Sequence, residues 1–163
     1  MSQKSKKLSH LDAQGRARMV DVSDKPDTKR VAIAQGAIAM SPQTLRLITT
    51  DKIAKGDVLT VAKLAGVMGA KKTSDLIPLC HPIPLDAIDL EFQPDLKTGR
   101  LTVTATATST GKTGVEMEAL TACAVALLTV YDMCKSAERG MVIEEIKLLE
   151  KRGGRSGLWK REL

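Results

Sequence analysis

The sequence is poor in aromatic residues. Phe92, Tyr131 and Trp159 are the only ones in 163 residues, and together they make up 2% of the chain. Domains that bind single-stranded nucleic acid stack successive bases on several exposed aromatic side chains. Because these three residues cannot build such a platform, we expect no nucleic-acid partner.

Cysteine and histidine are also scarce. The chain has three cysteines, Cys80, Cys123 and Cys134, and two histidines, His10 and His81. An odd number of cysteines without C-x-x-C spacing argues against a disulfide framework and against a zinc site. We therefore expect no metal, no cofactor and a cytoplasmic location, where thiols stay reduced.

Long hydrophobic runs are missing as well. The longest apolar stretch, residues 120–131, is interrupted by Thr121 and Thr129. It is shorter than the roughly 20 residues that a membrane-spanning helix needs. The first residues contain no apolar segment of the kind found in secretory signals. These features predict a protein without a membrane partner.

Positive charge is concentrated at the two ends of the chain. The net charge is +6, and residues 1–30 contain eight Lys or Arg against four Asp. Residues 151–163 contain five Lys or Arg against one Glu, so the interior is slightly acidic, unlike a domain that coats a duplex. The basic ends favour either a local anionic ligand or solvated tails. Composition does not choose between the two.

The length suits one compact domain with an extension at each end. We predict a polar N-terminal arm over residues 1–30, a folded domain over residues 31–150 and a basic, glycine-rich tail over residues 151–163. Within the domain, the hydrophobic periodicity predicts strands at 31–40, 86–93, 101–108 and 142–150, and helices at 42–50, 58–70 and 115–138.

This order of elements indicates the fold class. The sequence β-α-α-β-β-α-β is typical of an α+β, ferredoxin-like split βαβ fold. It has an antiparallel sheet with helices on one face, here with an extra helix in the first crossover. Gly36 is expected to mark a bulge in the first strand. In the last strand, Val142, Ile146 and Leu148 are expected to point inward.

The predicted helix 115–138 is apolar around nearly its whole circumference. One small sheet covers only one side of such a helix, so burial in an oligomer interface is the simplest arrangement. At about 100° per residue, its polar side chains fall within an arc of roughly 120°. They are Glu118, Thr121, Thr129, Asp132 and Lys135.

Two interpretations of Asp132 and Lys135 stay open. Their i, i+3 spacing at a helix end suits a structural ion pair. A lysine beside a carboxylate is also how proteins build proton-transfer pairs, in which desolvation lowers the pKa of the lysine. Glu118 lies 14 residues before Asp132, or about 21 Å along the helix axis. One small-molecule site containing both would draw them from different chains.

Two glycine-rich segments carry cations next to turns. S-T-G-K-T-G at residues 109–114 is not a P-loop, because Thr106 stands where that motif needs its first glycine. Its turn, with Lys112, could still hold an anion. K-R-G-G-R-S-G at residues 151–157 suits either a phosphate chain or a solvated tail.

A proline-rich segment, L-I-P-L-C-H-P at residues 76–82, is expected to form a rigid wall of a binding site. It contains Cys80 and His81. Adjacent side chains of an extended segment point in opposite directions, so these two are not expected to act as a nucleophile and its base.

Five motifs are specific when they are taken together and in order. They are M-V-D-V-S from Met19, K-G-D from Lys55, D-L-I-P-L-C-H-P from Asp75, T-G-K-T-G-V-E-M-E-A-L-T-A from Thr110 and Y-D-M-C-K from Tyr131. In this set the chain closely resembles the MoaC family, the cyclic pyranopterin monophosphate synthases of molybdenum cofactor biosynthesis. The resemblance extends over roughly residues 9–157.

The resemblance implies a lyase with a small-molecule, nucleotide-derived substrate. The family converts 3′,8-cyclo-7,8-dihydroguanosine 5′-triphosphate to cyclic pyranopterin monophosphate and releases pyrophosphate. It also implies a homo-oligomer, a hexamer built as a trimer of dimers with active sites at subunit interfaces. Such an assembly agrees with the apolar helix, and a triphosphate substrate agrees with the basic ends.

The resemblance further implies roles for eleven residues. By motif, the catalytic residues are Asp132, Lys135 and Lys55. The substrate-binding residues are Leu79, Cys80, His81, Met117 and Glu118, with Arg30, Lys71 and Lys151 as phosphate contacts.

An alternative of a different class shares the same order of elements. Ferredoxin-like domains also serve as non-catalytic nucleotide-binding or regulatory modules. An RNA-binding version needs aromatic residues on its central strands, and residues 101–108 offer only aliphatic residues and threonines. An assay of pyrophosphate release separates an enzyme from a regulatory module.

Overall fold

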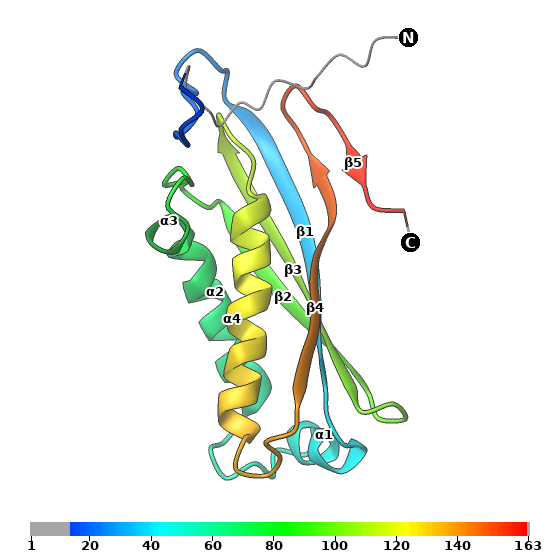
Figure 1. Cartoon of the computed structure of the whole chain (residues 1–163). Helices are drawn as coiled ribbons and strands as arrows, with labels where there is room; N and C mark the ends of the chain where they lie inside the picture. Colours follow the sequence, from blue (N-terminus) through cyan, green and yellow to red (C-terminus); the bar gives the residue numbers. More distant parts are fainter. Residues whose placement is uncertain (1–13, 163) are drawn as a thin grey trace.

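The computed structural model describes residues 14–162 (Figure 1), so residues 1–13 of the predicted arm lie outside the described part. The helices are α1 (Pro42–Thr49), α2 (Val58–Lys71), α3 (Thr73–Leu76) and α4 (Glu116–Cys134). The strands are β1 (Thr28–Ala39), β2 (Ala87–Asp95), β3 (Arg100–Gly111), β4 (Val142–Arg152) and β5 (Trp159–Lys160).

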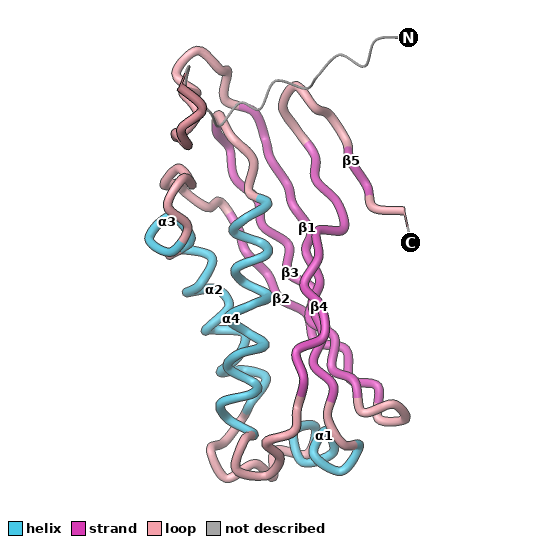
Figure 2. Tube along the Cα trace, viewed as in Figure 1, coloured by secondary structure: helices cyan, strands magenta, loops and turns pink. Residues whose placement is uncertain are grey.

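All five strands belong to one antiparallel sheet with the order β2-β3-β1-β4-β5. Helices α2 and α4 lie side by side against one face of this sheet (Figure 2). The predicted α+β class, with a ferredoxin-like arrangement and an extra helix between β1 and β2, is confirmed. The strand β5 was not predicted. It pairs with β4, so part of the basic tail extends the sheet.

The alternation of apolar residues in the sequence correctly predicts which side chains of β3 face the core. Leu101, Val103, Ala105 and Ala107 are fully buried and share one hydrophobic core with the inward side of α4. The threonines between them are half-buried on the opposite face, as the alternation of strand side chains requires.

The expected helix caps are also present. Ser41 Oγ accepts a hydrogen bond from the backbone amide of Thr44 at the start of α1. Asp57 Oδ1 accepts one from the amide of Thr60 at the start of α2. Each cap satisfies one of the amides that a helix leaves without a partner in its first turn.

Gly36 has a different role from the predicted bulge. It pairs regularly with Val103 of β3 and Ile146 of β4, while the register between β1 and β4 shifts after Ile33 and after Ala37. A Cβ on Gly36 would lie 2.7 Å from Leu127 Cδ1. The glycine therefore lets α4 approach the sheet closely, which is a packing reason that periodicity does not reveal.

The last helix and the last strand depart from expectation near their junction. Helix α4 ends at Cys134 rather than at 138. Beyond its end, the carboxylate of Glu138 accepts hydrogen bonds from the amide and hydroxyl of Ser41. In β4, Val142 is 56% exposed and Ile146 38% exposed. Of the three side chains expected to point inward, Leu148 packs against the core.

Within residues 14–162, α4 is also the one helix long and apolar enough to suit a membrane span by composition. It packs against α2 and against β1, β3 and β4. More than half of it is buried inside the fold. It is therefore a core helix of this fold.

Candidate active site

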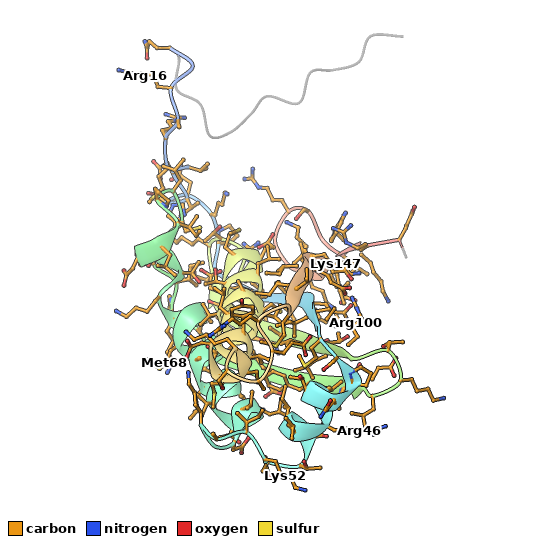
Figure 3. The ribbon with its side chains drawn as sticks, turned by 60° about the horizontal axis from the view of Figure 1, so that its bottom comes forward. Arg16, Arg46, Lys52, Met68, Arg100 and Lys147 are labelled. Carbon is orange, nitrogen blue, oxygen red and sulfur yellow. The ribbon has the colours of Figure 1, made fainter. Side chains whose placement is uncertain are left out.

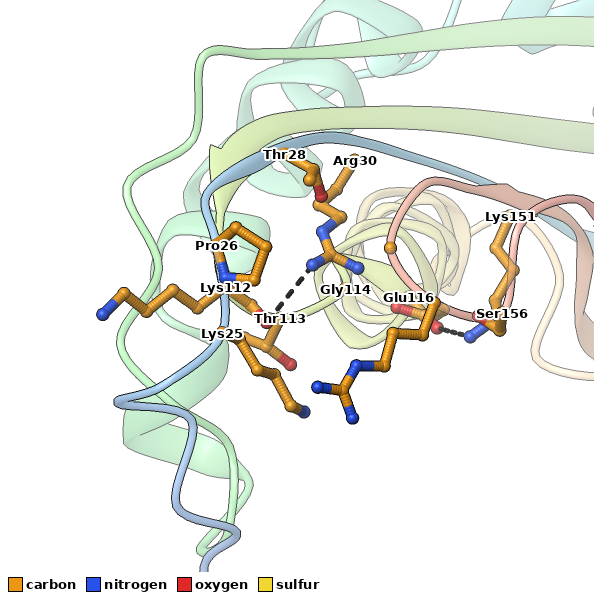
Figure 4. Close-up of a pocket in the computed structure, with 12 residues that line it drawn as sticks. Lys25, Pro26, Thr28, Arg30, Lys112, Thr113, Gly114, Glu116, Lys151 and Ser156 are labelled. Atoms are coloured by element: carbon orange, nitrogen blue, oxygen red, sulfur yellow. Dashed lines mark hydrogen bonds and ion pairs between the residues drawn. The ribbon is translucent and has the colours of Figure 1, made fainter.

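A cavity of about 520 Å³ lies at one end of the sheet, where β1 begins and β4 ends (Figure 4). Its lining is strongly cationic. Five basic side chains contribute to it, namely Lys25, Arg30, Lys112, Lys151 and Arg155, against the single acid Glu116 among the described lining residues. Such a concentration of cations in a hollow attracts polyanions.

Arg30 is held in this cavity by the turn after β3. Its Nε donates to the carbonyl oxygen of Gly111 at 3.2 Å, and its Nη2 donates to that of Lys112 at 3.3 Å. Gly154, with φ +69°, passes directly over the guanidinium, where a Cβ would collide with Arg30 Nη1. A side chain at this position would be strained by the positive φ and would displace the guanidinium of Arg30.

A second cavity of about 330 Å³ adjoins the first. It is lined by Leu79, Cys80, His81, Met117 and Glu118, among others. The two cavities share four lining residues, Lys25, Thr113, Gly114 and Glu116. The two cavities are therefore neighbours, and together they are called the hollow, with a cationic end and a less charged end.

Hydrogen bonds fix the wall of the second cavity. His81 Nε2 lies 2.8 Å from the carbonyl oxygen of Val20. The buried hydroxyl of Ser109 donates to the carbonyl oxygen of Pro84 at 2.7 Å. His81 is thus engaged with the N-terminal segment through Nε2, and its role toward Cys80 stays a prediction.

Glu118 is the buried acid of the second cavity. It is 3% exposed, and its Oε2 has no hydrogen-bond partner within residues 14–162. Burial raises the pKa of this carboxyl, and the negative charge of Glu116 adds to the effect. Burial likewise raises the pKa of the Cys80 thiol, with a further contribution from Glu118. The thiol is therefore protonated at neutral pH.

The three predicted catalytic residues form a separate cluster at the other end of α4. Lys135 Nζ lies 2.7 Å from Asp132 Oδ1, and Lys55 Nζ lies 2.9 Å from Asp132 Oδ2. Hydrogen bonds from Lys135 and Lys55 lower the pKa of Asp132 to about 2. The hydrogen bond and charge of Asp132 raise the pKa of Lys135.

This cluster differs from the sequence expectation in one respect. Lys135 was expected to be desolvated, with a lowered pKa, but its side chain is 53% exposed in the single chain. The hydrogen bond from its ammonium to Asp132 raises the pKa of Lys135 instead. Lys135 therefore keeps its proton around neutral pH.

The sequence-predicted residues thus fall into two groups. Arg30, Lys151 and the five residues of the second cavity lie around the hollow at the N-terminal end of α4. Lys55, Asp132 and Lys135 lie at its C-terminal end, about 21 Å away at the rise of an α-helix. Lys71, at the end of α2, is exposed and lines neither cavity.

Sequence reasoning missed several residues of the hollow, among them Lys25, Thr28 and Glu116. Lys25 lies in the segment predicted as a polar N-terminal arm, yet it lines both cavities. Glu116 also lines both, two positions before Glu118 in the same motif. The sequence E-M-E could have indicated Glu116, because it places the carboxylates of Glu116 and Glu118 together in the first turn of the helix.

Within the described part of the chain, no group of three or more His, Cys, Asp or Glu side chains is arranged to hold a metal ion. The three cysteines are free thiols.

Comparison with known proteins gives consistent results over the whole chain. The MoaC family model matches residues 19–154. A cyclic pyranopterin monophosphate synthase of Thermomicrobium roseum is 54% identical over 155 residues, which cover 95% of this chain and 93% of the relative. That of Novosphingobium aromaticivorans is 59% identical over 153 residues, covering 94% and 96%. That of Chloroflexus aurantiacus is 53% identical over 161 residues, covering 99% of both chains. The chain belongs to the MoaC family.

Proposed function

We propose that this protein is a cyclic pyranopterin monophosphate synthase, a lyase of molybdenum cofactor biosynthesis. Its substrate is 3′,8-cyclo-7,8-dihydroguanosine 5′-triphosphate, and its products are cyclic pyranopterin monophosphate and pyrophosphate. The printed names of the relatives, at 53% to 59% identity, support the activity.

One structural observation carries the proposal. Two buried side-chain oxygens lack a hydrogen-bond partner within residues 14–162, Thr28 Oγ1 and Glu118 Oε2. Each belongs to a residue that lines one of the adjoining cavities. Buried polar atoms are rarely left without partners, so both oxygens are available to a bound ligand. A nucleotide derivative fits, with its phosphates at the cationic end and its ring system at Glu118.

The cationic end binds the triphosphate. Arg30 and Lys151 come from β1 and β4, and Lys25, Lys112 and Arg155 come from the loops around them. Arginine contacts phosphate through two parallel N–H groups, and lysine contributes a point charge. Lys71 is a further proposed phosphate contact, because its exposed position on α2 leaves its ammonium accessible.

The other end holds the ring system. A carboxyl with a raised pKa, such as that of Glu118, can donate or accept a hydrogen bond at a ring nitrogen. Leu79, Cys80 and Met117 supply apolar contact, and His81 fixes the wall through Val20.

Lys55, Asp132 and Lys135 move protons in the reaction. Ring opening, reclosure and formation of the cyclic phosphate all transfer protons between nitrogen and oxygen atoms. Protonated Lys135 is a proton donor, and ionised Asp132 is a proton acceptor and holds both lysines in place. Desolvation by substrate and a second subunit would lower the pKa of Lys135 and make its proton easier to transfer.

The two ends of α4 meet in one site only if subunits associate. We propose a hexamer, a trimer of dimers, in which the hollow of one subunit faces the Lys55–Asp132–Lys135 cluster of another. Exposed apolar residues support association. Val61, Leu64 and Met68 are 42%, 60% and 67% exposed and follow one another along the outer side of α2, where Met68 is seen in Figure 3.

The proposed location is the cytoplasm, since all three cysteines are free thiols. The proposed partners are the small-molecule substrate and further copies of the chain, without nucleic acid or membrane.

The direct test incubates the purified protein with the cyclised nucleotide. We expect cyclic pyranopterin monophosphate and pyrophosphate in equal amounts. Mass spectrometry detects the pterin product, and a phosphate assay coupled to pyrophosphatase measures the pyrophosphate. Binding of the nucleotide without turnover would favour a regulatory module and would overturn the proposal.

A further inference from the structure

Glu116 occupies an unexpected position for an acid. It is the single carboxylate among the described side chains that line the cationic cavity, and it also lines the second cavity. Its Oε1 lies 2.7 Å from the Nζ of Lys151 (Figure 4), and its side chain is 25% exposed. The carboxylate therefore stands where the two cavities meet.

The loop before α4 is shaped around this carboxylate. A Cβ on Gly114 would collide with the carboxylate oxygens of Glu116. Any residue other than glycine would push Glu116 out of its place beside Lys151. The fold thus accommodates an acid at a point where a neutral side chain would leave the cavity more attractive to phosphate.

A carboxylate at this point opposes the binding of a polyanion in two ways. It repels the phosphate oxygens, and it competes with them for the ammonium of Lys151. Both effects weaken the binding of a polyanion in the cationic cavity. An enzyme that releases pyrophosphate at each turnover benefits from such weakening, because slow release of a product limits turnover.

We propose that Glu116 sets the affinity of the cationic cavity for pyrophosphate, by holding Lys151 between turnovers and displacing the anion after the reaction. This role rests on the proposed function for the identity of the anion. Glu116 is then a residue that tunes release, and Lys151 is the group through which it acts.

An ion pair that merely orients Lys151 for phosphate binding predicts the opposite behaviour. If orientation were its purpose, removing the charge of Glu116 would misplace Lys151 and weaken the binding of phosphate. If Glu116 tunes release, removing the charge strengthens binding. The sign of the change in affinity therefore separates the two roles.

The test measures the binding of inorganic pyrophosphate to the assembled full-length protein by isothermal titration calorimetry. Glu116→Gln removes the charge and keeps an oxygen for Lys151. We expect affinity to rise about three- to tenfold, the scale of one unit charge near an anion in a partly solvated cavity. Added pyrophosphate should inhibit this variant at correspondingly lower concentrations.

Glu144→Gln is the matched control. Glu144 forms an ion pair with Arg100 at 2.8 Å, and Arg100 pairs with Ala39, at the opposite end of β1 from Arg30. The affinity of the Glu144→Gln variant for pyrophosphate should equal that of the unsubstituted protein. Glu116→Asp retains the charge and should stay within about twofold of it. Glu116→Ser repeats the neutral substitution if the glutamine variant fails to assemble.

Unchanged or weaker binding by the neutral variants would overturn the proposal, as would tighter binding by Glu116→Asp. Absence of pyrophosphate binding to the unsubstituted protein would overturn it too. None of these results bears on whether the protein forms the pterin product, which the assay with the cyclised nucleotide decides separately.

Discussion

Lys55 Nζ lies 2.9 Å from Oδ2 of Asp132 and 2.9 Å from its carbonyl oxygen, although 77 positions separate the two residues. The contact joins the loop before α2 to the last turn of α4. The Nζ of Lys135 contacts Oδ1, the other oxygen of the same carboxylate. Two ammonium groups thus share one acid, and the cluster keeps a net positive charge for an anionic substrate.

The carboxyl of Asp132 should titrate near pH 2 because Lys135 and Lys55 donate hydrogen bonds to its ionised form. A folded-state pKa below the ordinary value of 3.8 means that the cluster stabilises the fold above that pH and loses this contribution as the pH falls toward 2. Carbon-detected NMR of the carboxyl measures the pKa directly. Lys55→Met should move it upward, and a midpoint near 3.8 in the unsubstituted protein would contradict the cluster.

Gly154→Ala should weaken substrate binding, since a Cβ there collides with the guanidinium of Arg30. Gly157→Ala is the matched control. Gly157 has a similar φ of +60° but nothing within 4 Å of its would-be Cβ, so this variant has only the backbone strain. Steady-state kinetics should show a larger rise in KM for Gly154→Ala. Equal KM values for the two variants would mean that Arg30 does not contribute to phosphate binding.

Cys80→Ser should retain turnover. Burial raises the pKa of the Cys80 thiol, so no thiolate is present at neutral pH, and His81 is engaged with Val20. The measurement is kcat, together with mass spectrometry of the unsubstituted protein during turnover. A covalent adduct on Cys80 would show that the thiol is a nucleophile after all.

Gly66→Ala should destabilise the fold. A Cβ on Gly66 would lie 2.5 Å from Leu90 Cδ2 and 3.0 Å from the carbonyl oxygen of Ala122, where α2 crosses α4. Overpacking of this kind costs about 1–3 kcal/mol against a gain in helix propensity of about 1 kcal/mol, so we expect a net loss of up to about 2 kcal/mol. Urea denaturation measures the difference. Gly140→Ala has open space and serves as the control. Equal free energies of unfolding for Gly66→Ala and Gly140→Ala would contradict this prediction, because they would mean that the helix contact accommodates the added Cβ without loss of stability.

Much of the fold follows from the sequence because its elements carry strong local signals. The alternation in β3 and the caps Ser41 and Asp57 are such signals, and all three are confirmed. The role of Gly36 depends on Leu127 and the contact of Glu138 depends on Ser41, and both partners are distant in sequence. Local patterns contain no information about such contacts.

The candidate site is less predictable for the same reason. The family resemblance pointed to Arg30, Glu118 and Lys151, which the fold gathers around one hollow. Lys25 was missed because its place above the cavity depends on the path of the N-terminal segment, which His81 and Lys112 hold through backbone carbonyls of Val20 and Ser23.

The central claim is that one active site combines Glu118 of one subunit with Lys135 of another. Glu118→Ala and Lys135→Ala should each abolish product formation. In co-refolded mixtures of the two variants at equal amounts, about one quarter of the sites regain both residues if subunits associate at random in a closed symmetric assembly. The most direct measurement is therefore the turnover of these mixed assemblies, with subunit exchange verified by native mass spectrometry. We predict recovery of about one quarter of the normal activity by this counting, and mixed assemblies as inactive as their parents would contradict a site shared between subunits.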